Sequence, residues 1–133
     1  LVLTPPDNGT EEDDGLLTAS EIAQLKLDAD WVILSACNTA SGDKPGAEGL
    51  SGLAKAFFYA GARALLVSHW PVESTAATQL TTTMFDELKA NPKIGRSEAL
   101  RRSMMTLAAN DNKPHYAHPA FWAPFVVVGE GGR

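Results

Sequence analysis

The chain has 133 residues, a length typical of one domain, and 44% of them are hydrophobic, which is ordinary for a globular protein. Its formal net charge is −5 and its longest basic run is Arg101-Arg102, which argues against a nucleic-acid partner, because such surfaces need clustered lysine and arginine. No apolar run approaches the roughly 20 residues of a membrane span, so we expect no membrane partner either.

The N-terminal region predicts a short strand followed by a short helix. Residues 1–3 are apolar and are stopped by two prolines. Thr18 and Glu21 have the spacing of a capping box, which marks a helix start, with Ile22 and Leu25 on the inward face. The chain has neither an initiator methionine nor a basic leader, and its first residues resemble the inside of a strand. We therefore expect it to be part of a longer protein.

Two buried strands follow, joined by one helix. Residues 31–36 are apolar without alternation, which is typical of a strand buried on both faces, and they lead into Cys37, the only cysteine. Residues 64–67 form the second such run, which leads into His69. Gly61 is expected to end the intervening helix, whose inward positions are Leu50, Leu53, Ala54, Phe57 and Phe58.

The C-terminal half predicts two helices and a final strand over residues 121–128. Asn91-Pro92 is expected to break the first helix, and Ser97 to cap the second, with Arg101 and Arg102 facing outward. Helical spacing gives the inward residues as Ala77, Leu80, Met84 and Leu88 in the first helix and Leu100, Met104 and Leu107 in the second.

The order of these elements predicts an α/β fold. Buried strands that alternate with helices indicate a mostly parallel sheet that is covered by helices on both faces. The direction of the final strand is left open by the sequence.

Cys37 and His69 are the first candidates for chemistry. If their strands are parallel neighbours, both residues lie at the carboxyl edge of the sheet, where α/β proteins bind ligands. A thiol needs a base to become a nucleophile, and His69 is one candidate. The backbone amides of Asn38 and Thr39 are candidates for an oxyanion site. The alternative is that Cys37 is inert packing and that His69 makes a structural hydrogen bond.

Other charged and metal-binding residue types give weaker signals. Asp43, Glu48 and Glu73 follow the strand ends and are either solvated or, in one case, part of a pocket for a basic substrate side chain. His115 and His118 have a His-x-x-His spacing without a nearby cysteine, which is a weak zinc signal. We predict no metal and no cofactor.

Several motifs together resemble the C-terminal half of a CHAT domain, the caspase-like module often found downstream of tetratricopeptide repeats. The resemblance covers nearly the whole chain. The motifs are Leu34-Ser35-Ala36-Cys37-Asn38-Thr39, residues 48–57, Gly61-Ala62-Arg63-Ala64, Ser68-His69-Trp70-Pro71-Val72, Glu98-Ala99-Leu100-Arg101 and residues 118–125.

The resemblance implies a three-layer α/β/α sandwich and a cysteine endopeptidase with a His–Cys dyad. By position, Cys37 is the nucleophile. The family's base is a histidine in a His-Gly pair after the preceding strand, and because this chain has no such pair we expect the base upstream of Leu1. The family does not use the His69 position as its base, so the resemblance argues against a Cys37–His69 pair. Relatives that cut after basic residues place an acid near Glu73.

The resulting hypothesis is that residues 1–133 are the C-terminal portion of one CHAT-like domain of a cysteine peptidase that acts on proteins or peptides. We expect tetratricopeptide repeats in the same parent chain, a bacterial source and, from the single cysteine, a reducing cytoplasmic location. Without its base the isolated chain should be inactive, and its exposed sheet edge favours a homo-oligomer.

Two other functions remain open at this stage. The first is an inactive caspase-like module for protein interaction or oligomerisation, in which Cys37 is vestigial. The second is a flavodoxin-like small-molecule domain, which is disfavoured because no glycine-rich phosphate loop directly follows a strand.

Overall fold

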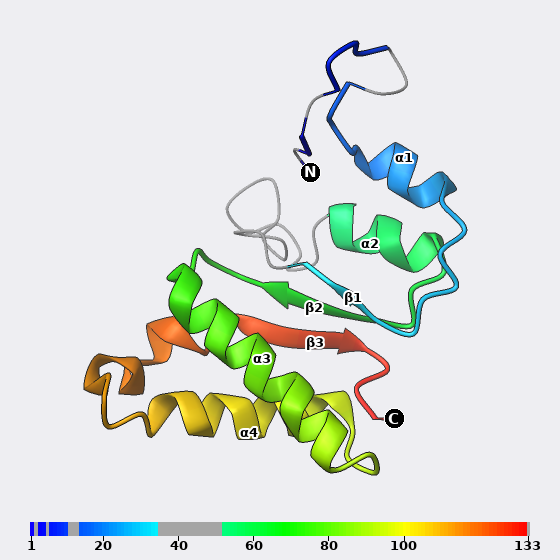
Figure 1. Ribbon diagram of the computed structural model, residues 1–133. Coiled ribbons are helices and arrows are strands. Elements are labelled where there is room, and N and C mark those ends of the chain that lie inside the picture. The colour runs from blue at the N-terminus through cyan, green and yellow to red at the C-terminus, as the bar shows by residue number, and fades with distance from the viewer. Residues whose placement is uncertain (2, 5, 11–13, 35–51, 133) are drawn as a thin grey trace.

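A small three-stranded sheet lies at the centre of the structure, a computed structural model that describes residues 1, 3–4, 6–10, 14–34 and 52–132 (Figure 1). The strand order is β1 (Val32–Ile33), β2 (Ala64–Ser68), β3 (Phe125–Gly129). β1 pairs with β2 in parallel, and β2 pairs with β3 antiparallel. The described part is therefore an α/β fold with a mixed sheet, and the direction that the sequence left open for the last strand is antiparallel.

Helices pack against both faces of this sheet (Figure 1). The core on one face contains residues of α1 (Ala19–Gln24) and α2 (Gly52–Tyr59), and the core on the other face contains residues of α3 (Ser74–Ala90) and α4 (Arg96–Ala108). Two short 3₁₀ helices, η1 (Pro114–Ala117) and η2 (Pro119–Phe121), lead into β3. No helix within the described ranges is long and apolar enough to span a membrane.

The central strand β2 explains why the sequence pattern shows no alternation. Successive side chains of a strand point to opposite faces. Leu65 and Val67 accordingly join the core beside α1 and α2, whereas Leu66 joins the core beside α3 and α4. All five residues of β2 are buried, so both faces need apolar residues and the run is continuously hydrophobic.

The signals for the first two helices are confirmed. The Thr18 hydroxyl accepts a hydrogen bond from the Glu21 amide while the Glu21 carboxylate accepts one from the Thr18 amide. Gly61, at φ +99°, follows α2, and the Ala62 amide donates to the Phe57 carbonyl over 3.0 Å. This is a Schellman-type ending, which favours glycine. Ile22 is fully buried as predicted.

Three boundary predictions are wrong, at the end of α1, the start of α4 and the start of β3. Leu25 is 40% exposed, because α1 ends before it and its backbone is extended. The N-cap of α4 is Gly95, and Ser97 lies inside the first turn, where its amide donates to the Gly131 carbonyl over 3.0 Å. The last strand begins at Phe125 because residues 119–121 form a 3₁₀ turn. The break of α3 at Asn91 is confirmed.

The N-terminal residues pair with the segment before α1. The Leu3 amide donates to the Gly15 carbonyl over 2.7 Å, and the Leu17 amide donates to the Leu1 carbonyl over 2.8 Å. Leu1 and Leu3 of the expected strand therefore pair with the segment before α1 and not with the three-stranded sheet.

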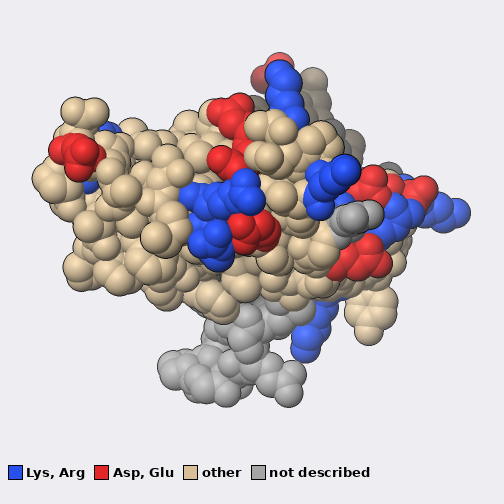
Figure 2. Space-filling model, turned by 90° about the horizontal axis from the view of Figure 1, so that it is seen from below, with Lys and Arg blue, Asp and Glu red and all other residues tan. Residues whose placement is uncertain are grey.

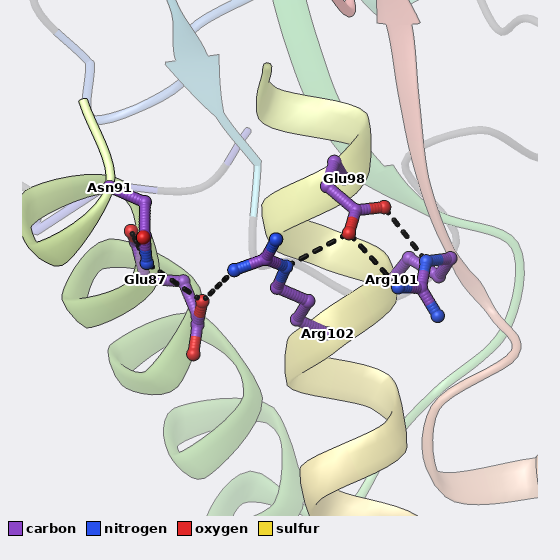
Figure 3. A network of polar contacts seen from close by, with 5 residues as sticks. All are labelled: Glu87, Asn91, Glu98, Arg101 and Arg102. Carbon is purple, nitrogen blue, oxygen red and sulfur yellow. Dashed lines mark hydrogen bonds and ion pairs between the residues drawn. The ribbon is translucent and has the colours of Figure 1, made fainter. Parts of the chain in front are cut away.

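Charged side chains of both signs are interspersed on the face seen in Figure 2, without one large basic patch. Part of this charge belongs to a network between α3 and α4 (Figure 3). Arg102 donates to Glu98 over 2.8 Å and to Glu87 over 3.1 Å, and Arg101 also donates to Glu98. Arg102 is half-buried rather than fully outward, because it bridges the two helices.

The network holds the pKa of Glu98 at about 2, chiefly through the hydrogen bonds from Arg101 and then Arg102. A lowered carboxyl pKa stabilises the folded state above the ordinary value of 4.5, and that contribution is lost as the pH falls toward about 2. We expect Glu98→Gln to lower the midpoint of urea unfolding slightly at neutral pH and not at pH 2. The effect is small because the ion pair of Glu98 with Arg101 is solvent-accessible. Asp111→Asn, outside the network, is the control; an equal deficit of Glu98→Gln at both pH values would contradict this account.

Candidate functional site

The carboxyl edge of the β1–β2 pair is the candidate site. Val32 and Ile33 pair with Leu65 and Leu66, and the Leu34 amide donates to the Leu66 carbonyl over 2.9 Å. The two strands are thus parallel neighbours, as the sequence predicts, and their carboxyl ends share one edge of the sheet. Cys37, Asn38 and Thr39 follow Leu34 in the sequence and lie outside the described residues. Their roles stay predictions.

His69 follows β2 at this edge and is exposed. Its amide donates to the Pro124 carbonyl over 3.0 Å, which extends the contact between β2 and the segment before β3 by one residue. The next residue, Trp70, is 40% exposed, and its indole N–H donates to the Ala120 carbonyl over 3.1 Å. The segment after β2 is therefore held by these two hydrogen bonds to Ala120 and Pro124.

Glu73, the acid predicted to contact substrate, directly precedes α3 and is exposed. Its side chain makes no capping hydrogen bond with the helix. Lys113 interacts electrostatically with it: the pKa of Lys113 lies above its ordinary value, chiefly because Nζ donates to the Tyr116 hydroxyl, over 3.0 Å, with a smaller contribution from Glu73.

The sequence reasoning gave no role to Lys113. Its ammonium group lies 4.8 Å from the centre of the Tyr116 ring as well as within hydrogen-bond distance of the hydroxyl. The three-residue spacing of Lys113 and Tyr116 could have predicted this contact, since side chains three apart in a 3₁₀ turn lie above one another.

His115 and His118 have structural partners in the described region. The His115 ring packs edge-on against Tyr116 and Phe121, with centroid distances of 4.6 and 5.4 Å. His118 Nδ1 accepts a hydrogen bond from the Ala120 amide over 3.2 Å, which caps η2. No group of three or more histidine, cysteine or acidic residues that could hold a metal occurs among the residues that the structure describes.

A hollow of about 400 Å³ lies between α3 and the strand β1. None of its described lining side chains is charged. They are Ile33 of β1, Val72 of the loop after β2, and Ser74, Ala77, Thr78, Thr81 and Thr82 of α3. The hollow therefore has a mixed lining, with the apolar Ile33, Val72 and Ala77 beside hydroxyl groups of α3.

Comparisons with known proteins identify the family. The family model "CHAT domain" matches residues 1–130. The chain is 33% identical over 118 residues to Tetratricopeptide repeat protein 28 of Mus musculus, and 32% identical over 114 residues to that of Homo sapiens. Each match covers 86% of this chain and 4% of the relative. No solved structure matches. The chain belongs to the CHAT domain family, whose model matches nearly its full length.

Proposed function

We propose that the intact protein is a cysteine endopeptidase in which Cys37 attacks a peptide carbonyl. The observation that carries this proposal is the parallel pairing of β1 with β2, because it supports the expectation that the sequence after β1 reaches the carboxyl edge where α/β domains bind ligands. The family assignment supports the same residue, since the motif around Cys37 is among those that carry the resemblance.

The chemistry follows the usual course of thiol catalysis. A histidine in a His-Gly pair upstream of Leu1 takes the thiol proton, and the sulfur forms a bond to the carbonyl carbon. The same histidine then protonates the leaving amine as the peptide bond breaks, which leaves a thioester. Water hydrolyses the thioester and regenerates the thiol. The amides of Asn38 and Thr39 stabilise the negative oxygen of the tetrahedral intermediates.

The fold in which this occurs is a caspase-like three-layer α/β/α sandwich, of which residues 1–133 are the C-terminal portion. The described sheet ends at β1, whose residues Val32 and Ile33 are apolar and half-buried, and the proposed upstream part would continue the sheet from there. The hollow beside Ile33 supports a sheet that continues past β1 with the upstream part of the domain packed against it. The names of the relatives support tetratricopeptide repeats in the same chain. A cytoplasmic location fits the single cysteine of the sequence.

Glu73 contributes a preference for a basic residue in the substrate. It is exposed next to the edge, and its carboxylate is not used to cap α3. Because Glu73 is exposed to solvent, which weakens its attraction for a basic side chain, the preference is modest: we infer roughly a threefold to tenfold higher kcat/KM for arginine peptides than for neutral ones. Glu73→Gln should abolish this difference, and an unchanged ratio would remove Glu73 from the site.

The base is tested by hydrolysis of fluorogenic peptides by the full-length protein. We expect His69→Ala to retain kcat/KM within about threefold, because His69 is not the general base, and substitution of the upstream histidine to reduce it by about 10²-fold or more. If His69→Ala gives the larger loss, the dyad is Cys37–His69 and our assignment of the base is wrong.

The second candidate function is an inactive interaction or oligomerisation module. The observation that favours it is that β1 ends the described sheet, since an open sheet edge pairs with other chains. Leu27 and Tyr59, the last residue of α2, are also exposed. Absence of peptide hydrolysis by the full-length protein, together with a stable homo-oligomer in light scattering, would favour this function over the peptidase.

A further inference from the structure

We draw no further inference here: the strongest candidate, the uncharged hollow of about 400 Å³ between α3 and the strand β1, belongs to the edge at which the upstream part of the domain is already proposed to pack, and nothing else in the structure shows what covers it.

Discussion

Cys37→Ala is expected to reduce peptide hydrolysis by the full-length protein by about 10⁴-fold or more, the loss typical of removing a covalent nucleophile. The physical reason is that no other group among the proposed catalytic residues can form the acyl intermediate, so only binding and oxyanion stabilisation remain. The measurement is kcat/KM on a fluorogenic peptide. Because the substitution removes only one sulfur atom, we expect the circular dichroism spectrum to stay unchanged.

Cys37→Ser supplies the matched control for this result. A serine preserves the size and a hydrogen-bonding group but, with its much higher pKa, is a poor nucleophile without a strong base. It should therefore lose nearly as much activity as Cys37→Ala. Hydrolysis that survives both substitutions would show that Cys37 does not carry the reaction.

Gly129→Ala is expected to destabilise the fold by about 3 kcal/mol, the combined magnitude of an unfavourable positive φ and an overpacked core. Gly129 ends β3 at φ +91°. An added Cβ would lie 2.6 Å from the Arg63 carbonyl oxygen and 3.0 Å from the Phe58 ring. The same Arg63 oxygen accepts a hydrogen bond from the Glu130 amide over 3.0 Å, so it cannot move away without breaking that bond. Urea unfolding of the chain measures the loss.

Gly132→Ala is the control in the same C-terminal segment. An added Cβ there meets nothing within 4 Å, so we expect a change within about 0.5 kcal/mol. Equal unfolding midpoints for the two variants would contradict the close approach of β3 to Arg63.

The strands and helices were predictable where a local pattern agrees with burial. The unbroken apolar run 64–67 predicts β2 because both of its faces are covered. The capping box and Gly61 fix the start of α1 and the end of α2 through short-range hydrogen bonds. The glycine at the start of α4, Gly95, was not predictable. It is needed because a Cβ there would clash with the carbonyl oxygens of Gly131 and Gly132, which are far away in the sequence.

The candidate site was predictable only in part. The parallel pairing puts the carboxyl ends of β1 and β2 at one edge of the sheet, with His69 directly after β2, and this follows from the alternation of strands and helices. The hydrogen bond from the Trp70 indole to the Ala120 carbonyl depends on the turns that return the chain to the sheet after α4, and neither residue has a local pattern that predicts the other. The hollow beside Ile33 likewise arises only from the packing of α3 against the sheet.

The most direct test of the central claim is the reaction of the full-length protein with a peptidyl chloromethyl ketone, followed by peptide mass spectrometry. We expect one adduct, on the Cys37 sulfur, that forms at least about tenfold faster than in the protein unfolded in urea, because only the folded site binds the peptide and activates the thiol. An adduct rate at Cys37 equal in the folded and unfolded protein would contradict the assignment of Cys37 as the nucleophile.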